Sequence, residues 1–560
     1  MSNTSTAAAA GAANPTLGNA VAEVDAVVVG AGFAGMYMLH KLREIGLSAK
    51  AFEAGDGVGG TWYWNRYPGA RCDIESLEYS YQFDEDLQQA WDWSERYATQ
   101  PELLAYANHV ADRFELRRDI AFETRVTGAA FDEAANRWTV TTRGADGSSA
   151  RTRARFFILA TGCLSSTNLP EFPGRDDFAG AAYHTGNWPH EGVDFTGKRV
   201  AVIGTGSSAI QSIPHIAAQA SHLFVFQRTP NYSIPAHNGP IPDDLRARIK
   251  ANYPQFRADN ANTGFGSKFD PGASPELAIA AEKSAFDVDE AERRAVYEAR
   301  WERGGLGFLS AFADLVFDKR ANDTAAEFVR EKIRATVKDP QVAELLAGKS
   351  IVGCKRLCVD SGYYETFNRD NVTLVDISGT PIERITPAGV QVGGHEYAVD
   401  AIVYATGFDA MTGTLVRMDI RGRGGLALAD KWAEGPGNYL GLSTVGFPNM
   451  FIITGPGSPS VLSNMLPSIE QHVRWIGRCL ADMQARQAQC IEPTPEAEAN
   501  WVGHVNDVAN SSLYPGCNSW YLGANVPGKA RVFMPYLGVA PYAAKCEEVV
   551  ARDYEGFAMR

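Results

Sequence analysis

A glycine-rich turn near the start of the chain constrains its fold more than any other feature. An apolar run leads into Gly30, Gly32, Phe33 and Gly35, and a segment with helical periodicity and a second apolar run follow. This order predicts strand, turn, helix and strand. In such a turn the first glycine permits the bend, the second lets the backbone approach a pyrophosphate, and the third lets the helix pack on the strand.

Glu53 ends the second apolar run and indicates a nucleotide site. At this strand end a carboxylate is placed to accept hydrogen bonds from a pair of ribose hydroxyls. An acid here favours an unphosphorylated ribose, as in FAD or NAD. A chance glycine turn is the alternative, but it would not need the strand, the helix and the acid around it.

A second copy of this unit begins near residue 198. Its turn consists of Gly204, Thr205, Gly206, Ser207, Ser208 and Ala209, and the equivalent strand end carries Gln227, Arg228 and Thr229 in place of an acid. An arginine can bind a 2′-phosphate through two hydrogen bonds, whereas a carboxylate would repel it. We therefore expect NADPH rather than NADH at this site. The alternative is a surface arginine without a ligand.

The chain of 560 residues is too long for one simple domain. Its two units predict an α/β fold with two Rossmann-like dinucleotide-binding domains, and charged amphipathic segments after the second unit predict a helical insertion. Two strands ending in Ala-Thr-Gly indicate where the chain passes between the domains. The predicted ranges are 1–20 for a disordered start, 21–160 and 401–560 for the first domain, 161–235 and 351–400 for the second domain, and 236–350 for the insertion.

Charge and hydropathy exclude several kinds of partner. A formal net charge of −14 argues against nucleic acids and anionic membranes. No apolar run approaches the roughly 18 residues of a membrane span, and the alanine-rich start lacks the features of a signal or transit peptide. We expect a cytoplasmic protein that is a monomer or a weak oligomer.

The cysteines form no recognisable site. There are eight, with no C-x-x-C pair and no Cys/His cluster at zinc spacing, so no metal site is expected. We expect all of them to be reduced thiols that pack as small buried hydrophobes. Their positions are Cys72, Cys163, Cys354, Cys358, Cys479, Cys490, Cys517 and Cys546.

Two dinucleotide sites in one chain indicate a flavin reduced by a nicotinamide, with FAD in the first domain and NADPH in the second. Disulfide reductases, NADPH oxidases and monooxygenases combine these cofactors. Reductases of this kind need a redox dithiol, and Cys354 and Cys358 do not have the usual C-x-x-C spacing. The reductase class is therefore disfavoured.

A segment after the first Ala-Thr-Gly distinguishes between the remaining classes. Phe178, Gly180, His184, Trp188 and Pro189 match the pattern F-x-G-x-x-x-H-x-x-x-W-P, on which the chain resembles Baeyer–Villiger monooxygenases. Related flavoproteins that oxygenate nitrogen or sulfur usually lack the Trp-Pro ending. The resemblance runs from about residue 21 onward and looks most like the phenylacetone and steroid monooxygenases. From the residues alone, His184 is predicted to hold a loop or act as a hinge, with Trp188 and Pro189 as packing elements.

The resemblance implies oxidation of ketones to esters or lactones with NADPH and O₂, through an anionic peroxide at the flavin C4a atom. Such an anion needs a fixed positive charge, which arginine supplies because it keeps its proton. Arg356 occupies the family's position for that residue, and Lys355 the position that helps to hold NADP. Asp73 matches the aspartate beside the arginine and is expected to orient it, with a plain structural salt bridge as the alternative.

The resemblance assigns further contacts to each cofactor. The residues expected near FAD, besides the first glycine turn and Glu53, are Thr61, Trp62, Trp64, Asp73, Tyr79, Val126 and Met465. The residues expected near NADP, besides the second glycine turn, are Arg71, Lys355, Arg356 and Trp520.

A loop rich in glycine and proline resembles the family's substrate-pocket loop. Its tip, Ser460, Val461 and Leu462, is expected to line a ketone pocket. Valine at 461 is found in the steroid-type relatives, where the phenylacetone type has alanine. We expect an aromatic, cyclic or steroid-like ketone, although the tail at 537–544 departs from these relatives.

Two alternatives come from other functional classes. A flavin oxygenase of sulfides or amines would share both nucleotide sites, but Trp188, Pro189 and Arg356 count against it as the main activity. A non-catalytic sensor of nucleotide redox state would also bind both cofactors. The presence of Lys355, Arg356 and Asp73 speaks against a sensor.

Overall fold

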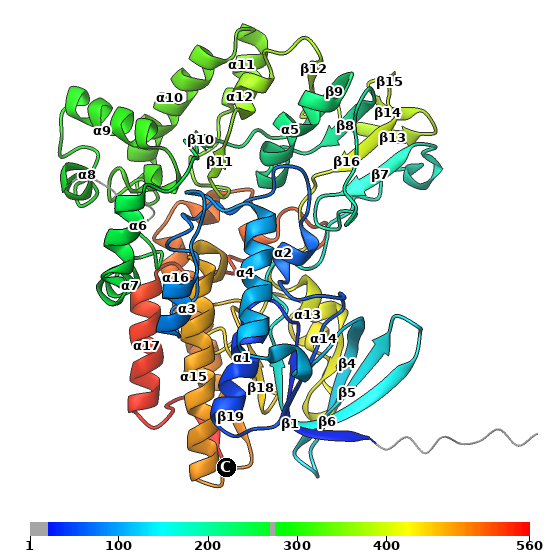
Figure 1. Cartoon of the computed structure of the whole chain (residues 1–560), viewed down its shortest axis with the longest axis vertical. Helices are drawn as coiled ribbons and strands as arrows, with labels where there is room; N and C mark the ends of the chain where they lie inside the picture. The colour runs from blue at the N-terminus through cyan, green and yellow to red at the C-terminus, as the bar shows by residue number, and fades with distance from the viewer. Residues whose placement is uncertain (1–20, 269–274) are drawn as a thin grey trace, which may run out of the picture.

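The computed structural model describes residues 21–268 and 275–560. The predicted disorder of residues 1–20 lies outside this part of the chain. Two separate sheets, each with its own helices, lie one above the other, and a group of helices flanks the upper sheet (Figure 1). The predicted α/β fold with two Rossmann-like domains is confirmed.

The first domain is built on an eight-stranded mixed sheet. Its centre is β1 (Ala22–Val29), which pairs in parallel with β2 (Ala49–Phe52) and β6 (Ser149–Leu159). The helix α1 (Phe33–Glu44) joins β1 to β2, as predicted, and packs against the long helix α15 (Met465–Ala485). The other strands are β3 (Ile120–Ala121), β4 (Thr124–Asp132), β5 (Arg137–Gly144), β17 (Asp419–Arg421) and β18 (Met450–Ile452).

The remaining elements of this domain are mostly helical. The helices are α2 (Thr61–Trp64), α3 (Glu85–Ala90), α4 (Gln100–Arg113), α13 (Gly413–Arg417), α14 (Leu428–Lys431), α16 (Pro495–Asn510) and α17 (Val539–Ala551). A small antiparallel pair, β19 (Ile491–Pro493) and β20 (Phe557–Met559), lies near the C-terminus. The C-terminal segments therefore return to the first domain, as the sequence predicted.

The second domain contains a five-stranded parallel sheet. Its strand order is β12 (Val372–Asp376), β9 (His222–Gln227), β8 (Arg199–Ile203), β16 (Ala401–Tyr404) and β7 (Ala181–His184). The helix α5 (Ser207–Gln219) joins β8 to β9 and repeats the arrangement of the first domain. Smaller elements are β10 (Ser233–Pro235), β11 (Cys358–Asp360), α12 (Tyr363–Thr366), β13 (Ile382–Thr386), β14 (Gly389–Val392) and β15 (His395–Ala398).

One predicted boundary needs correction. The sequence analysis began the second part of the first domain at residue 401, but β16 lies in the second sheet between β7 and β8. The chain returns to the first domain only after the second Ala-Thr-Gly. The sequence of a buried parallel strand does not show to which sheet the strand belongs, because such strands are apolar on both faces in either domain.

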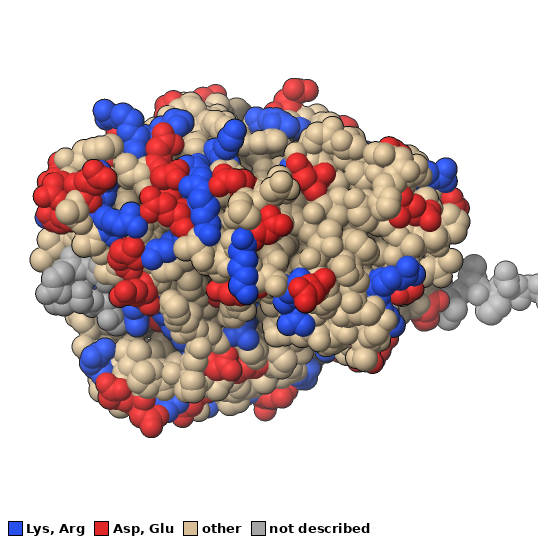
Figure 2. All heavy atoms as spheres, turned by 90° about the horizontal axis from the view of Figure 1, so that it is seen from above, with Lys and Arg blue, Asp and Glu red and all other residues tan. Residues whose placement is uncertain are grey.

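The insertion is helical, as predicted. It contains α6 (Asp243–Lys250), α7 (Tyr253–Ala261), α8 (Pro275–Ala280), α9 (Glu290–Arg303), α10 (Lys319–Thr336) and α11 (Pro340–Ala347). Ion pairs connect the exposed faces of three of these helices, including Lys332 with Glu298 at 2.5 Å and Arg334 with Glu344 at 2.6 Å. Figure 2 views the molecule from this end and shows acidic and basic side chains interspersed.

The two domains contact each other through a loop and a helix. The Tyr67 hydroxyl of the first domain donates to Gln211 Oε1 on α5 at 2.8 Å, and Gln211 Nε2 donates to the Arg71 carbonyl at 3.1 Å. A Cβ at Gly69 would lie 2.5 Å from the Gln211 carbonyl oxygen. The absence of a side chain at Gly69 therefore permits this close approach.

A buried carboxylate joins the insertion to the first domain. Glu78 is fully buried and accepts hydrogen bonds from Ser267 Oγ at 2.5 Å and from the Lys268 backbone N–H at 3.0 Å. Burial, together with the charge of Glu75, raises the Glu78 pKa from 4.5 to about 7.

This raised pKa predicts a pH-dependent stability. The contribution of protonated Glu78 is fully present below the unfolded pKa near 4.5 and is lost as the pH rises through about 7, because the unfolded chain releases the proton first. We expect Glu78→Gln to remove up to about 3 kcal/mol of the fall in unfolding free energy between pH 5 and pH 8. Denaturant unfolding at both pH values measures it. The exposed Glu434→Gln is the control, and an equal effect of both substitutions would contradict the prediction.

Candidate active site

The first glycine turn has the geometry of a pyrophosphate site. Gly30 has a φ of 101°, and a Cβ at Gly35 would lie 1.9 Å from the Gly30 carbonyl oxygen. No side chain fits between helix and turn at Gly35, as the spacing predicted. The helix α1 begins at Phe33 after Gly32, and no side chain caps it. Its first backbone N–H groups are therefore free to bind an anion.

Glu53 lies directly beside this turn. Its Oε2 accepts the Ala31 backbone N–H at 2.8 Å, and its Oε1 accepts the Gly55 N–H at 2.9 Å. The two hydrogen bonds fix the carboxylate at the end of β2. A carboxylate oxygen can accept more than one hydrogen bond, so this geometry leaves acceptor capacity for ribose hydroxyls.

The second turn repeats the first. Gly204 has a φ of 114°, and α5 begins at Ser207 after Gly206 without a side-chain cap. All three hydroxyls of this turn have partners within the protein. Thr205 donates to the Thr229 carbonyl at 2.9 Å, the Ser208 hydroxyl lies 3.0 Å from that of Thr185, and the Ser207 hydroxyl lies 3.2 Å from Cys358 Sγ. Backbone N–H groups are therefore the main donors that the turn offers to an anion.

Two cations lie near this turn without acidic partners. Arg228 is exposed at the end of β9, and Lys355 is partly buried. Burial lowers the pKa of the Lys355 ammonium, and the positive charge of Arg228 lowers it further. Neither forms an ion pair with a carboxylate within residues 21–268 and 275–560. Such a pair is suited to a phosphate.

Gln227 adds a free acceptor at the same strand end. Its side chain is 2 % exposed, its Nε2 donates to the Leu345 carbonyl at 2.9 Å, and its Oε1 has no hydrogen-bond partner in the described part of the chain. A buried acceptor without a partner is costly. A ligand N–H or a water molecule would satisfy it.

Arg356 and Asp73 form a two-pronged ion pair. Arg356 Nε donates to Asp73 Oδ2 at 2.5 Å, and Nη2 donates to Oδ1 at 2.8 Å. Burial lowers the pKa of the guanidinium, but the charge and hydrogen bonds of Asp73 outweigh that effect, so the net shift is upward. The arginine therefore stays charged over the whole working pH range.

The remaining terminal nitrogen of the Arg356 guanidinium contacts the predicted substrate loop. Arg356 Nη1 donates to the Val461 carbonyl at 2.7 Å. Val461 belongs to a short 3-10 turn (Ser460–Leu462), in which Ser460 has a φ of 45° and its hydroxyl lies 2.9 Å from Cys163 Sγ. The structure thus brings the loop tip and the charged pair together.

An apolar cluster surrounds this loop. Its members come from four segments of the chain, so no single stretch of sequence contains the cluster. They include Cys163, Ala410, Met411, Val461, Leu462, Tyr514, Tyr521, Phe533 and Met534, with Met465 and Trp520 packed against them. The sequence analysis did not identify Tyr514 and Tyr521. Burial raises the pKa of both hydroxyls, and the nearby charge of Arg356 opposes the shift in each.

Aromatic residues predicted near FAD lie between the turn and Asp73. Trp62 is buried and donates through its indole N–H to the Tyr79 hydroxyl at 3.2 Å, and Phe33 meets Tyr79 edge to face. Trp64 is half-buried beside Tyr63. The other residues predicted near FAD are more scattered: Thr61 is exposed at the start of α2, Val126 is buried in β4, and Met465 begins α15.

The fingerprint segment runs along the boundary between the domains. Burial lowers the pKa of His184 to about 4, so this side chain is neutral at neutral pH, and its Nδ1 accepts the Gly186 N–H at 3.0 Å. Trp188 is buried against Tyr183 and Phe195. This geometry is that of loop-holding side chains, whereas the hinge role of the segment stays a prediction.

One contact of this segment was not predicted from the sequence. His190 follows Trp188 and Pro189 and meets the ring of Tyr63 edge to face, with 4.8 Å between the ring centroids. This contact connects the fingerprint to the first domain. No spacing rule marks it, because the two residues are far apart in the sequence.

Arg71 has a different partner from the one expected. Instead of lying free for NADP, its Nη1 lies 3.4 Å from Glu95 Oε2. An ion pair at this distance that is partly exposed to solvent holds the Arg71 side chain only weakly. The assignment of Arg71 to NADP stays a prediction.

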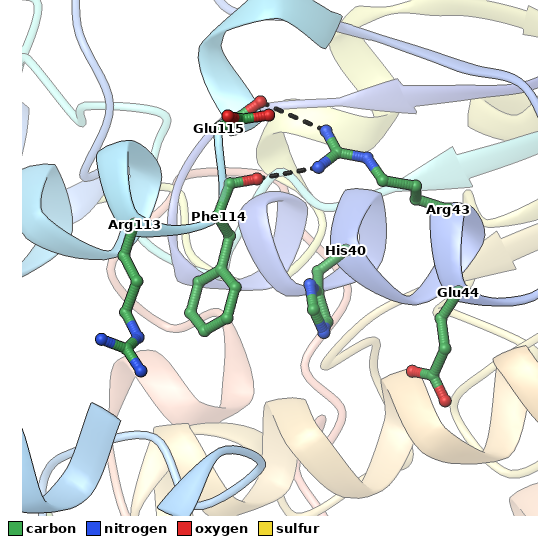
Figure 3. Close-up of a pocket in the computed structure, with 6 residues that line it drawn as sticks. All are labelled: His40, Arg43, Glu44, Arg113, Phe114 and Glu115. Atoms are coloured by element: carbon green, nitrogen blue, oxygen red, sulfur yellow. Dashed lines mark hydrogen bonds between the residues drawn. The ribbon is translucent and has the colours of Figure 1, made fainter. Parts of the chain in front are cut away.

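One surface depression lies away from these residues. It has a volume of about 390 Å³ and is lined by His40, Arg43, Glu44, Arg113, Phe114 and Glu115 (Figure 3). Arg43 already donates to the carbonyls of Phe114 and Glu115. The depression is at the last turn of α1, and the dinucleotide turn is at the first, about 15 Å away along a helix of this length.

The expectation for the cysteines was wrong in one respect. Cys354 and Cys517, 163 residues apart, form a disulfide, and the other six are buried free thiols. A pairing across such a separation cannot be deduced from spacing. Disulfides are uncommon in reducing compartments, so this bond weighs against the cytoplasmic location, which stays a prediction.

The described ranges, 21–268 and 275–560, contain neither a candidate metal site nor a helix that could span a membrane. No group of three or more His, Cys, Asp or Glu side chains is placed to hold a metal ion. No helix there is both long enough and apolar enough to cross a membrane.

Known proteins share this arrangement. Residues 27–253, which include both glycine turns, match a family model described as pyridine nucleotide-disulphide oxidoreductase. The chain is 44% identical over 541 residues to a Baeyer–Villiger monooxygenase of Pseudooceanicola batsensis, a match that covers 95% of this chain and 96% of the relative. The chain belongs to the Baeyer–Villiger monooxygenase family. The family and the enzyme class predicted from the fingerprint are therefore confirmed.

Two further relatives of this Baeyer–Villiger monooxygenase are named for different substrates. A solved structure described as oxidized steroid monooxygenase bound to NADP has a TM-score of 0.89 and 55% identity, and the match covers 96% of this chain and 99% of that one. A phenazine N-monooxygenase of Lysobacter antibioticus is 42% identical over 538 residues, covering 95% of this chain and 96% of the relative. One relative of the chain is therefore named for the oxygenation of nitrogen.

The unpaired cations predict the nicotinamide preference of this Baeyer–Villiger monooxygenase. We expect Arg228→Ala to raise the KM for NADPH about 10- to 100-fold and to leave the KM for NADH within twofold, because only NADPH has a 2′-phosphate to lose a charge-assisted hydrogen bond. Steady-state oxidation of both nucleotides measures it. Arg248→Ala removes one exposed positive charge from α6 and is the control. Equal losses with NADPH and NADH would contradict the assignment.

Proposed function

We propose that this enzyme uses FAD, NADPH and O₂ to convert ketones with an aromatic, cyclic or steroid-like substituent into esters or lactones. One observation carries the proposal. Arg356 is a permanently charged side chain that Asp73 holds in place, and it donates a hydrogen bond to the backbone of an apolar loop. The residue before it in the chain, Lys355, is a cation suited to bind a phosphate of the nicotinamide nucleotide. A ketone oxygenation needs these features side by side.

The residues present fit both cofactors. In the first domain, the uncapped start of α1 would hold the FAD pyrophosphate and Glu53 its ribose, with Trp62 and Tyr79 along the ring system. In the second domain, the start of α5 would hold the NADPH pyrophosphate, and Arg228 with Lys355 its 2′-phosphate.

When bound, FAD accepts a hydride from NADPH and supplies an oxygen atom from O₂ to the carbonyl. The protein's own contribution is electrostatic. Arg356 is fixed before the reaction, so its charge can stabilise negative charge on the reacting oxygens without reorganisation. Asp73 holds the guanidinium plane by two hydrogen bonds. The apolar cluster around Val461 excludes water, which strengthens this interaction.

The loop tip supports a bulky ketone. Val461 and Leu462 are 5 % and 7 % exposed, and Met411, Phe533 and Met534 share their cluster. Aliphatic and methionine side chains adapt to large apolar surfaces and offer few hydrogen bonds. The 55% identity to a steroid monooxygenase points the same way.

Oxygenation at nitrogen or sulfur is the second candidate. It is favoured by the 42% identity to a protein named as a phenazine N-monooxygenase. The redox-sensor alternative would apply if no substrate were turned over. The cytoplasmic location and the monomeric or weakly oligomeric state stay predictions from the sequence.

The proposal predicts ester or lactone formation that depends on Arg356. Purified enzyme supplied with NADPH and phenylacetone, or a bulky cyclic ketone, is expected to yield the ester or lactone by mass spectrometry. Arg356→Ala is expected to lower this yield by about 10²-fold or more, because a fixed donor at developing charge typically contributes this much. Stopped-flow reduction of the flavin by NADPH should remain measurable.

Arg356→Lys is the matched variant. It keeps the positive charge but not the two-pronged contact with Asp73, so we expect a partial loss of product. Sulfoxide or N-oxide without any ester would favour the second candidate. Hydrogen peroxide as the only product with every ketone would overturn the proposed function.

A further inference from the structure

The Cys354–Cys517 disulfide joins two segments of the active site. The two Cα atoms are 5.6 Å apart, and the residues are separated by 163 positions. Cys354 lies two residues before Arg356. Cys517 lies three residues before Trp520, between the 3-10 turn Tyr514–Gly516 and the 3-10 turn Trp520–Leu522. A covalent bond therefore connects the loop of the charged pair to the segment predicted near NADP.

The loop around Cys354 has little regular structure of its own. Residues 351–357 belong to no helix or strand, and Gly353 has a φ of 85°. Its other anchors are side chains: Asn322 exchanges hydrogen bonds with the Val352 backbone, and Asn231 donates to the Arg356 carbonyl at 3.1 Å. Loops of this kind depend on such contacts for a single conformation.

The segment that carries Trp520 is anchored firmly at its other end. Lys529 donates to Asp409 at 2.7 Å and to the Ala410 carbonyl at 2.8 Å, in a mostly buried position. Asn525 donates to the Phe408 carbonyl at 2.7 Å. Residues 408–410 follow the second Ala-Thr-Gly, so this end is fixed to the crossing between the domains.

The disulfide holds the beginning of the segment together with a few backbone contacts. The Cys517 backbone N–H donates to the Tyr514 carbonyl at 2.9 Å, and the Leu513 backbone N–H donates to the Val316 carbonyl at 2.9 Å. Around the bond, Val316, Val352, Leu513 and Tyr514 leave a cavity of only about 10 Å³. Apolar packing therefore surrounds the disulfide, and the fold should persist without it.

We propose that this disulfide is a positioning element of the active site, which holds the Trp520 segment against the Arg356 loop so that NADP stays bound through the reaction. The inference rests on the proposed function for the roles of Arg356 and Trp520. Without the bond, the start of the segment keeps only its backbone contacts and apolar packing, so we expect it to sample more conformations. Ordering it when NADP binds then lowers the affinity.

The test uses the FAD-loaded, full-length enzyme and three variants: Cys354→Ser, Cys517→Ser and the double variant. Cys490→Ser is the control, since Cys490 lies beside β19 and belongs to neither nucleotide site. Alkylation of denatured protein without reductant, followed by mass spectrometry, should label six cysteines in the wild type and eight after treatment with dithiothreitol. In that treatment the dithiol passes two electrons and two protons to the cysteine sulfurs and becomes a cyclic disulfide.

The decisive measurement is the Kd for NADP⁺ by calorimetry, which needs no ketone. We expect an increase of about three- to tenfold in each variant and in the reduced wild type, with no change in Cys490→Ser. We also expect a larger share of the NADPH consumed to appear as hydrogen peroxide instead of ester. The reduced wild type provides the same test if a variant does not fold.

Two results would overturn the inference. One is labelling of eight cysteines without reductant. The other is a set of variants that keep the wild-type Kd and the wild-type ratio of peroxide to ester and lose only thermal stability, since a merely structural bond would behave in this way. Failure of the proposed function is a separate result: the wild type would form no ester, while the thiol count and the Kd would still be measurable.

Discussion

The contact between Asp73 and Arg356 is the constraint on which the rest of this active site depends. The two residues are 283 positions apart and belong to different parts of the chain, and Val461 from a third segment completes the coordination of the guanidinium. Removal of one partner from this partly buried pair leaves an uncompensated charge, which is destabilising. The position of both domains and of the substrate loop is therefore coupled to one side chain.

The scaffold around this pair is regular, but the site itself is not. The sheets fix the glycine turns at the carboxyl ends of β1 and β8, where open α/β sheets bind their ligands. The segments at 353–356, 460–462 and 517–529 are irregular and are fixed by side-chain hydrogen bonds, an ion pair and a disulfide. Such loops can be replaced during evolution without changing the fold, which fits the range of substrates in the names of the relatives.

The sequence predicted those features whose causes are local. The turns at Gly30 and Gly204 follow from backbone conformation, and the helices α9 and α10 from hydrophobic periodicity. Arg356 and Asp73 were identified only through the family resemblance, because nothing near either residue points to the other. Contacts between distant segments were missed altogether: the Cys354–Cys517 bond, His190 against Tyr63, and the membership of β16 in the second sheet. Each depends on tertiary packing, which a single sequence does not contain.

The surroundings of the three cations Arg228, Lys355 and Arg356 agree with the roles proposed for them. The chain has a net charge of −14, yet Arg228 and Lys355 have no acidic partner among the described residues, whereas Arg356 has one. A cation that must bind a phosphate keeps its affinity only if no carboxylate competes for it. A cation that must stabilise charge at one position needs a carboxylate that fixes its orientation. Burial lowers the pKa of Lys355, and the positive charge of Arg228 lowers it further. Binding of NADPH would relieve the repulsion between these two cations, so the nucleotide should stabilise the folded enzyme as well as take part in its reaction.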